Sequence, residues 1–511
     1  MKRALLRFLL TLLLTTPLAA YADDLQKLDP IDLGAKRELF IDDYLVDQME
    51  NVALTIHSPE RKEIAAQFDR PWEDGGEGYA TILKEDGKYR AYYRAWGLKE
   101  NYPMKYCCLE SDDGLKWTRP ELGLCEYEGV SANNIMLDEV AGTQLGTQDF
   151  TPFRDPRPDC PDDERYKAVG NGFGAFEGRG PHGLFGWKSA DGVHWTLVQS
   201  DPIFTDGKFD TQNIAFWSEL EKKFVLYYRE FTNNVRVIVR ATSDDFRHWT
   251  REGEIQFPNG GGPSLREQFY TNQIQPYYRA SHIYVGFPTR YVDNGLIEST
   301  KHLPEWQDRQ RRMKLFSGGE RLGTATTDIL FITSRDGVNF NRADDVYIRP
   351  NLRVNSNWFY GDNYTAYNVV ETKSADDDSP NELSIYVIEA SNSHRPTRLR
   401  RYALRIDGFG SLHAKSREGV VVTKPLTFDG DKLSINVATS SAGYVKVELL
   451  DQDGNAIPGF SADDSDLIFG DDLDRVVTWK GKPDLASLAN KPVRIRFIMY
   501  EADVYSLVFQ R

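Results

Sequence analysis

Acidic residues recur at the start of short apolar segments, in clusters that also carry asparagine and aromatic residues. The clusters read EDGGEGYATIL, TPFRDPRPD, FDTQNIAFW, FYTNQIQPYY and YGDNYTAYNVV. In or beside them stand Asp74, Glu77, Asp155, Asp210, Glu267 and Asp362, with Asn213, Asn272 and Asn363 as polar neighbours. Hydrolysis of a glycosidic bond needs two carboxyl groups, one that donates a proton and one that is ionised. Acids that converge in one funnel acquire different pKa values through repulsion and burial, so we expect at least two of them to be catalytic.

Arginine and aromatic residues accompany these acids. Arg94, Arg229 and Arg290 occupy equivalent positions at the ends of second strands. Because an antiparallel hairpin returns that end to the start of the first strand, we expect them among the acids. They either hold the carboxylates in ion pairs or, together with Arg154, recognise a substrate carboxylate or sulfate. The aromatic candidates for stacking on sugar rings are Trp72, Tyr79, Trp96, Phe209, Tyr270, Trp358 and Tyr360, although most aromatics of a repeat belong to its core.

The elements that position these residues repeat along the chain. Asp-rich turns followed by an aromatic lie at 111–117, 189–195, 242–249 and 333–340, with a weaker copy at 405–412. Each follows two strands and one polar cluster. This order predicts an all-β chain with a five-bladed β-propeller over 37–415, whose inner strands start around a common axis. Residues 37–46 should supply the strand that closes the last blade, and the charged segment 300–322 should be a surface excursion.

The two ends of the chain differ from the repeat. Residues 1–22 combine Lys2 and Arg3 with an apolar run and a final Ala-Tyr-Ala, which predicts a cleaved signal peptide and a periplasmic or secreted protein. Alternating strands around DQDGN predict a small separate β-sandwich over 417–511.

Composition bears on partners and cofactors. The formal charge of -15 disfavours nucleic acid and anionic membrane surfaces as partners. No segment after the leader is long and apolar enough for membrane insertion. The histidine and cysteine spacings match no zinc site, so we expect no metal and no other cofactor. A disulfide through Cys125 or Cys160 remains open, as does the oligomeric state.

Several segments together resemble the five-bladed β-propeller glycosidases of glycoside hydrolase families 32, 43 and 68, and most closely the bacterial family-32-like propellers with a C-terminal sandwich. The segments are LFIDDYLV, FTPFRDPRPDCPDDERYKA, FDTQNIAFW, EQFYTNQIQPY, TDILFITSRDGVNFNR, RRYALRIDGFGSLHA and TKPLTFDG. The resemblance implies an acid in blade one, an Asp in a blade-two Arg-Asp-Pro motif that orients the sugar, and a Glu as general acid. FRDP at 153–156 matches Asp155 to the second role. The blade-one pattern WMNDPNG and a blade-three Glu-Cys motif are absent.

These observations favour a glycoside hydrolase that acts on a poly- or oligosaccharide, an anionic one if the arginines bind substrate. In this hypothesis Asp155 and Asp210 orient the sugar or act as base, and Glu267 or Glu77 is the general acid, with Asp74 the alternative acid in blade one. A non-catalytic glycan-binding propeller remains open. So does a polysaccharide lyase, which would use Tyr or His with Arg to abstract a proton.

Overall fold

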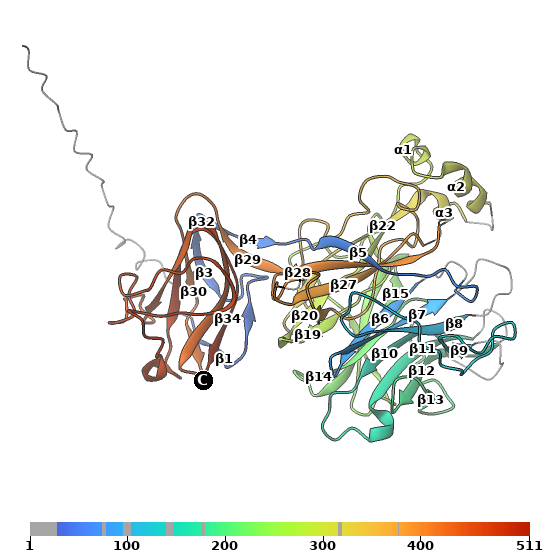
Figure 1. Cartoon of the computed structure of the whole chain (residues 1–511), viewed down its shortest axis with the longest axis horizontal. Helices are drawn as coiled ribbons and strands as arrows, with labels where there is room; N and C mark the ends of the chain where they lie inside the picture. The colour runs from blue at the N-terminus through green and yellow to red at the C-terminus, as the bar shows by residue number, and fades with distance from the viewer. Residues whose placement is uncertain are drawn as a thin grey trace, which may run out of the picture. The chain divides into compact units, whose positions relative to one another are not determined.

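The chain forms two compact units built almost entirely of β-strands (Figure 1). The computed structural model describes residues 28–73, 78–95, 104–138, 147–174, 179–314, 319–376, 378–391, 393 and 395–511. Unit 2 spans 56–410, and unit 1 combines the segments before and after it, up to residue 55 and from 411 onward. The predicted signal peptide over 1–22 lies outside the described residues. The all-β prediction is confirmed.

Unit 2 contains a series of antiparallel sheets, each built from consecutive strands. Sheet one has β6 (Ala80–Glu85), β7 (Lys88–Ala95), β8 (Lys105–Ser111) and β9 (Ile135–Asp138). Sheet two has β10 (Gln148–Arg154), β11 (Tyr166–Gly174), β12 (Arg179–Ser189) and β13 (Thr196–Leu197). Sheet three has β14 (Ile214–Ser218), β15 (Lys223–Thr232), β16 (Val235–Ser243) and β17 (Thr250–Glu254). β6 and β14 therefore follow polar clusters, whereas β10 already contains the first residues of the cluster TPFRDPRPD at 151–159.

Sheets four and five depart from this simple order. Sheet four has β19 (Gln275–Tyr277), β20 (Ala280–Gly286), β23 (Ile332–Ser334) and β24 (Phe340–Arg342). A separate small sheet of β18 (Gln268–Phe269), β21 (Thr289–Asp293) and β22 (Ala325–Ile329) is interleaved with it. Sheet five has β25 (Tyr364–Thr365), β26 (Val370–Thr372), β27 (Glu382–Glu389), β28 (Arg398–Arg405) and, from far earlier in the chain, β5 (Glu60–Gln67).

The Asp-rich turns are held by their own side chains. In the first, the hydroxyl of Ser111 accepts a hydrogen bond from the backbone N–H of Gly114 at 2.9 Å, and Asp113 accepts from Leu115 at 2.7 Å. The indole of Trp117 then donates to the carbonyl of Gly114 at 3.1 Å. Gly114 has φ of +78°, a conformation that favours glycine. The turns at 189–195, 243–249 and 334–340 repeat most of these bonds.

Each of these turns contacts the sheet before it in the chain, and the series returns to its start. The contacts are Arg90 to the carbonyl of Asp191 at 2.8 Å, the rings of Phe153 and Phe246 at 5.6 Å, Tyr227 to the carbonyl of Gly337 at 2.6 Å, Tyr277 to the carboxylate of Asp407 at 2.7 Å, and Tyr386 to the carbonyl of Gly114. They run from sheet one to two, two to three, three to four, four to five and five back to one. The inter-sheet contacts of unit 2 therefore form a closed ring.

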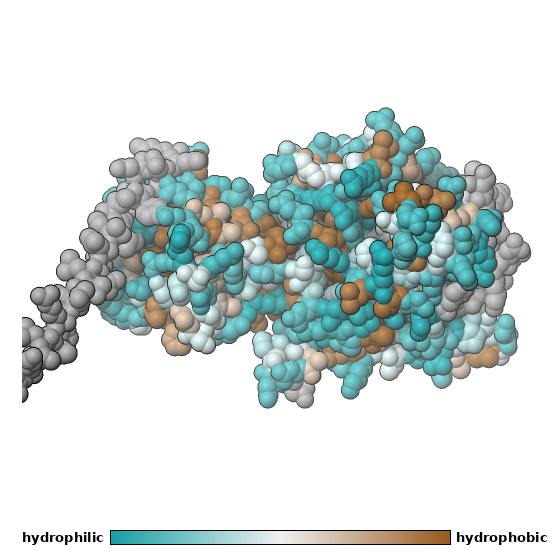
Figure 2. Space-filling model, turned by 90° about the horizontal axis from the view of Figure 1, so that it is seen from above, coloured by the Kyte–Doolittle hydropathy of each residue, from teal (hydrophilic) through white to brown (hydrophobic). Residues whose placement is uncertain are grey.

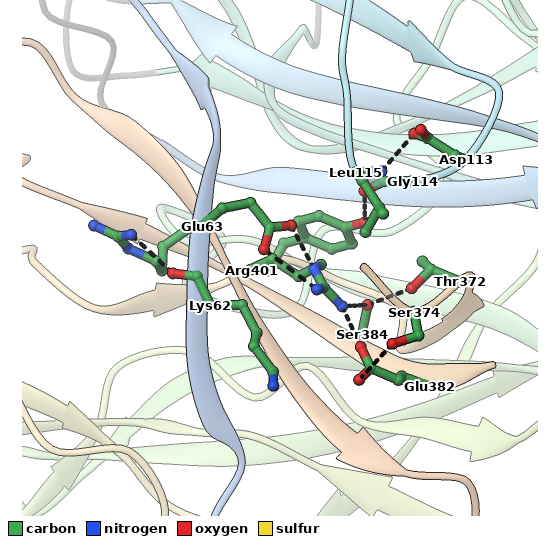
Figure 3. Close-up of polar contacts among 12 residues, drawn as sticks. Lys62, Glu63, Asp113, Gly114, Leu115, Thr372, Ser374, Glu382, Ser384 and Arg401 are labelled. Atoms are coloured by element: carbon green, nitrogen blue, oxygen red, sulfur yellow. Dashed lines mark hydrogen bonds and ion pairs between the residues drawn. The ribbon is translucent and has the colours of Figure 1, made fainter. Parts of the chain in front are cut away.

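Strand β5 completes sheet five by pairing with β28 (Figures 1 and 3). Figure 3 shows the guanidinium of Arg401 between Glu63 of β5 and Glu382 of β27, at 2.6 and 2.8 Å. The prediction that residues 37–46 close the last sheet is wrong. That segment contains β2 (Glu38–Leu39), which pairs with β34 in unit 1. Sequence position alone could not separate the two candidates, because both segments lie near the start of the chain.

The charged segment between β21 and β22 is more than a surface excursion. It folds into three short helices, α1 (Glu298–Lys301), α2 (Trp306–Arg312) and α3 (Arg321–Thr324). Arg309 is fully buried and donates to the carbonyls of Pro304 at 2.7 Å and Trp358 at 2.6 Å. Burial lowers the pKa of Arg309 to about 10, and the nearby Arg312 adds to this. Arg309 thus fixes the helical insertion to the loop that precedes β25.

Unit 1 includes strands from both ends of the described chain, not only from 417–511 as predicted. The early strands are β1 (Ile31–Gly34), β2, β3 (Val46–Glu50) and β4 (Val52–Ile56). The late ones are β29 (Gly410–Ala414), β30 (Gly419–Thr423), β31 (Leu426–Phe428), β32 (Lys432–Leu450), β33 (Asp471–Val476) and β34 (Arg494–Gln510). The long strands β32 and β34 pair with each other, and their apolar residues line one core with Trp479.

The cysteines, the helices and the surface complete the description of the fold. All four cysteines lie in the described residues and none forms a disulfide, so the disulfide that the sequence left open is absent. Among the described residues, no helix has both the length and the apolar character needed to cross a bilayer. Polar residues dominate the face of the molecule seen in Figure 2, with apolar residues in smaller groups.

Candidate active site

Two carboxylate–arginine pairs lie at the ends of sheets one, two and three where the innermost strands begin. Asp149 is the second residue of β10, and its Oδ1 lies 2.6 Å from Nη1 of Arg94 at the end of β7. Asp210 precedes β14, and its Oδ2 lies 3.4 Å from Nη2 of Arg229 on β15. Because β7 and β15 run antiparallel to β6 and β14, both arginines return to the same end of their sheets.

The two carboxyl groups have different surroundings. The side chain of Asp149 is fully buried, whereas that of Asp210 is 73% exposed. Burial raises the pKa of Asp149 to about 7; Arg94 and Arg229 oppose this rise, and the negative charge of Asp210 adds to it. Oδ2 of Asp149 has no hydrogen-bond partner among the described residues. Near neutral pH the site therefore combines a carboxyl group that readily holds a proton with a solvent-facing carboxylate.

A row of stacked tyrosines brings sheets four and five to the same place. Tyr79, just before β6, stacks on Tyr364 of β25 with ring centroids 5.5 Å apart, and Tyr364 stacks on Tyr270 at the same distance. The guanidinium of Arg94 lies 4.6 Å from the ring centroid of Tyr79, and that of Arg229 lies 5.7 Å from Tyr270. The start of every inner strand thus contributes to one cluster. Burial raises the pKa of Tyr79 well above its usual value, so this phenol does not suit the proton abstraction of a lyase.

The sequence located part of this cluster. Arg94, Arg229 and Asp210 come together as expected, and Tyr79 and Tyr270 lie beside them. The hydroxyl of Tyr360 is 2.7 Å from that of Tyr270, so this third aromatic candidate also belongs to the group. Asp74, Glu77 and Trp96 lie outside the described residues.

Asp155 and Arg154 are not at this site, and their predicted placement is wrong. They stand at the far end of β10, about 20 Å along the strand from Asp149 at roughly 3.3 Å per residue. Asp155 is bound by Arg157 at 2.8 Å and by Lys167 at 2.9 Å. Burial would raise the pKa of Asp155, but these hydrogen bonds outweigh it and lower the pKa. Arg154 pairs with Glu85, 2.9 Å away.

Glu267 and Arg290 form a separate ion-pair cluster. Arg290 of β21 binds both carboxylate oxygens of Asp328, at 2.8 and 2.6 Å, and also contacts Glu267 at 3.1 Å. A second cation, Arg342, lies 3.1 Å from the same oxygen of Glu267. Burial would raise the pKa of Glu267, but the bonds from these two arginines lower it. The predicted role of Glu267 as proton donor is therefore not supported, because this carboxylate is held ionised.

The other candidates serve the framework. Asn213, Asn272 and Asn363 are buried and donate to main-chain carbonyls, namely those of Phe209 and Thr211, Tyr227, and Thr327. They brace the turns that start the inner strands. Asp362 is buried and accepts from the N–H of Ala390 at 2.8 Å. Burial, with the nearby charge of Glu389, raises the pKa of Asp362 to about 8.

Three of the aromatic residues predicted to stack on sugar rings make contacts within the protein. Trp358 donates to the carbonyl of Asn351 at 3.0 Å, and Trp72 donates to Asn134 at 2.8 Å. Phe209 is 1% exposed and lies in an apolar core cluster. We therefore expect Phe209 not to stack on a sugar, whereas the bonds of Trp72 and Trp358 orient their half-buried rings.

Asp149 is the residue that the sequence reasoning missed. It follows a segment outside the described residues and directly begins the inner strand of sheet two, in the sequence TQDF. Its position matches the polar clusters of the other repeats, whereas the FRDP sequence lies one strand length downstream. A search for the acidic residue nearest the start of each inner strand would have selected Asp149. Among the described residues, no group of three His, Cys, Asp or Glu side chains is arranged to hold a metal ion.

A hollow elsewhere does not coincide with this cluster. It encloses about 590 Å³ and is lined by Glu85, Arg90, Asp112 and Tyr166, among others. Glu85 ends β6 and Tyr166 begins β11, so the hollow lies toward the end of sheets one and two opposite to Asp149.

No protein-family model matches the sequence, and no curated protein matches it either. Solved structures of glycoside hydrolases are similar to the chain. BT0996, solved as an RGII complex, is 14% identical, over 68% of this protein and 92% of BT0996, with a TM-score of 0.41. The Bombyx mori GH32 β-fructofuranosidase BmSUC1 is 10% identical, over 92% and 95%, with a TM-score of 0.38. A thermostable family-43 glycoside hydrolase is 12% identical, over 66% and 91%, with a TM-score of 0.39. Families 32 and 43 are among those that the sequence motifs resemble.

Proposed function

We propose that this protein hydrolyses glycosidic bonds in a poly- or oligosaccharide at the Asp149–Asp210 cluster. The observation that carries the proposal is the contrast between these two acids. Asp149 is buried with a pKa raised to about 7, and Asp210 beside it is open to solvent. A glycosidase needs one carboxyl group that keeps a proton near the working pH and one that is ionised. The same contrast separates the acid from the base in other pairs of carboxylates.

In this proposal Asp210 is the base, which activates water or attacks the sugar carbon. Its ion pair with Arg229, at 3.4 Å, orients it. Asp149 keeps the proton: Oδ1 accepts from Arg94, so the proton resides on Oδ2, which has no other hydrogen-bond partner among the described residues. Glu77, with Asp74 as its alternative, remains a second candidate proton donor from the sequence, since its segment directly precedes Tyr79.

The test compares single variants on substrates with different leaving groups. The panel holds neutral and uronic-acid oligosaccharides and the matching dinitrophenyl glycosides, whose leaving group needs no protonation. Asp210→Asn should lose activity on both kinds of substrate, by about 10²-fold or more. Asp149→Asn should lose activity on oligosaccharides and keep it on dinitrophenyl glycosides. If Glu77→Gln shows that second pattern instead, Glu77 is the proton donor. Full activity of Asp210→Asn would refute the proposed site.

A second candidate function is non-catalytic glycan binding. It is favoured by the ion pairing, since both acids of the cluster already have an arginine partner at 2.6 and 3.4 Å. Calorimetry on the same oligosaccharides separates the two functions. Binding without released sugar, in wild-type protein and in Asp210→Asn alike, would establish the binding module and exclude the hydrolase.

The proposal extends to architecture and location. The closed series of contacts between sheets supports a five-bladed β-propeller, with the acids at the end of its axis. The long strands β32 and β34 support a β-sandwich for unit 1. The leader over 1–22 supports export to the periplasm or beyond. N-terminal sequencing of protein from the periplasm or medium should begin at Asp23, and a start at Met1 would contradict cleavage.

A further inference from the structure

A second pair of arginines lies against the tyrosines of the site. Arg236, the second residue of β16, has its guanidinium carbon 5.2 Å from the ring centroid of Tyr270 and 4.9 Å from that of Tyr291. Arg321, the first residue of α3, lies 5.0 Å from the ring centroid of Tyr360. The rings are neighbours, with centroids of Tyr291 and Tyr360 at 5.9 Å. The two cations therefore face one aromatic group.

Neither arginine is neutralised by a carboxylate of the described residues. Arg236 donates through Nη1 to the side-chain carbonyl of Gln268 at 2.6 Å, while its Nε is buried and has no partner among the described residues. Arg321 donates to the hydroxyl of Tyr360 at 3.0 Å. By contrast, Arg229 and Arg290 each contact an aspartate. Two partly buried guanidinium groups thus keep donors that an anion can fill.

One acid beside these tyrosines, Asp293, is occupied by other donors. Asp293, at the end of β21, accepts from the hydroxyl of Thr324 at 2.6 Å, from the N–H of Gly295 at 3.0 Å and from the hydroxyl of Tyr291 at 3.4 Å. Among the described residues, no ion pair joins Asp293 to Arg321 or to Arg236. The two arginines therefore keep a positive charge that no carboxylate of these residues pairs with.

The geometry places this charge next to the proposed catalytic acids. Tyr270 is shared, because the guanidinium of Arg229 lies 5.7 Å from its ring and that of Arg236 lies 5.2 Å from it. Arg229 in turn binds Asp210. The position of Arg321 depends on the helical insertion, which Arg309 fixes by bonds to the carbonyls of Gly323 and Trp358. The insertion therefore adds a cation to one side of the site.

We propose that Arg236 and Arg321 form a subsite for a sugar that carries a carboxylate or sulfate group. This inference rests on the proposed function and narrows its substrate to anionic glycans. The guanidinium groups would donate to the anionic oxygens, and the ring of Tyr360, which is half-buried whereas Tyr270 and Tyr291 are buried, would cover the sugar. Two planar guanidinium groups suit such oxyanions, because each presents paired donors.

The test measures binding of simple sugars, apart from hydrolysis. The probes are D-glucuronate, D-galacturonate, glucose 6-sulfate and, as the neutral reference, D-glucose, each titrated by ligand-observed NMR. At least one anionic sugar should bind wild-type protein about tenfold more tightly than glucose, since a hydrogen bond to a charged group contributes about 1.5–3 kcal/mol. The uronates and the sulfate separate the two anionic groups. If no anionic sugar binds more tightly than glucose, the subsite is refuted.

Variants connect the binding to these residues. Arg236→Gln and Arg321→Gln should each weaken the preferred anionic sugar about tenfold and leave glucose unchanged. Arg321→Lys should keep part of the preference. The control is Arg251→Gln, because Arg251 lies on β17 of the same sheet as Arg236 and pairs with Asp206. Unchanged selectivity in the double Arg236→Gln, Arg321→Gln variant would also refute the subsite. Asp210→Asn should keep the anionic preference, so a failed hydrolase and a failed subsite give different results.

Discussion

Replacing Asp149 by asparagine should change how the stability of unit 2 depends on pH. Asparagine is the neutral isostere of a protonated aspartic acid, and its side-chain oxygen can still accept from Arg94. The pKa of Asp149 rises from 3.8 to about 7 in the folded protein, with burial as the main cause. A raised pKa of an acid means that the folded state binds its proton more tightly than the unfolded state does. This contribution to stability is complete below pH 4 and is lost as pH rises through 7.

The size of this change in the free energy of unfolding follows from the pKa values of Asp149 in the unfolded and folded protein. At about 1.4 kcal/mol for each pKa unit, the rise is equivalent to about 4 kcal/mol between pH 4 and pH 8. Wild type and Asp149→Asn should therefore have similar stability near pH 4. Above pH 8 the variant should be more stable by up to about 4 kcal/mol, because it carries no buried charge.

Urea unfolding followed by tryptophan fluorescence measures this difference. Nine of the ten tryptophans lie between residues 56 and 410, so the signal reports chiefly on unit 2. Midpoints are compared at intervals from pH 4 to pH 8.5. Asp112→Asn is the control, because Asp112 is exposed and should not alter the pH profile. Parallel profiles for wild type and Asp149→Asn would refute the assignment of a raised pKa to Asp149, and with it the proton-holding role.

Three further predictions concern the ring and the rejected acid. Gly114→Ala should destabilise unit 2 by about 1–3 kcal/mol, because a Cβ there would lie 2.5 Å from a side-chain carbon of the last sheet. The control is Gly87→Ala, at a glycine with the same φ of +78° but open space around it. An equal loss of melting temperature in both variants would show that the contact of Gly114 with the last sheet is unimportant. Arg401→Met should lower stability by about 1–3 kcal/mol, less than for fully buried pairs because its carboxylate partners are partly exposed, and should speed proteolysis within β5. Lys62→Met, at a half-buried lysine that among the described residues pairs only with the exposed Glu60, should do neither. Glu267→Gln should keep the turnover rate within about threefold, since a carboxylate bound by two arginines donates no proton; a hundredfold loss would restore Glu267 as the acid.

Local sequence predicted the repeat well because its signals are local. Each Asp-rich turn satisfies its own N–H groups, so the motif at 111–117 carries its structure with it. The hairpin rule likewise placed Arg94 and Arg229 beside the starts of the inner strands, where the structure has them.

The wrong predictions concern the position of an acid along its strand and the pairing of a distant strand, which no local sequence pattern determines. Asp155 has the Arg-Asp-Pro context that the resemblance favoured, yet it stands at the opposite end of the strand from Asp149, and only the strand start distinguishes the two. The closing strand was misplaced for a similar reason. β5 and the segment at 37–46 both lie near the start of the chain, and pairing with β28 is decided by contacts between residues more than 300 positions apart.

The discontinuous make-up of both units has a consequence for the order of events during biosynthesis. β5 cannot pair with β28 until the ribosome has synthesised the stretch between Lys62 and Arg400, which are 338 positions apart. This synthesis takes roughly 20–70 s at rates of about 5–20 residues per second. Residues up to 55 wait longer still, for partners after 411. Unit 2 cannot finish folding on the ribosome until residue 410 has emerged, and unit 1 cannot finish until nearly all of the chain has emerged. Until β28 has emerged, the edge of β5 is unpaired, and an unpaired strand edge can pair with another chain and cause aggregation.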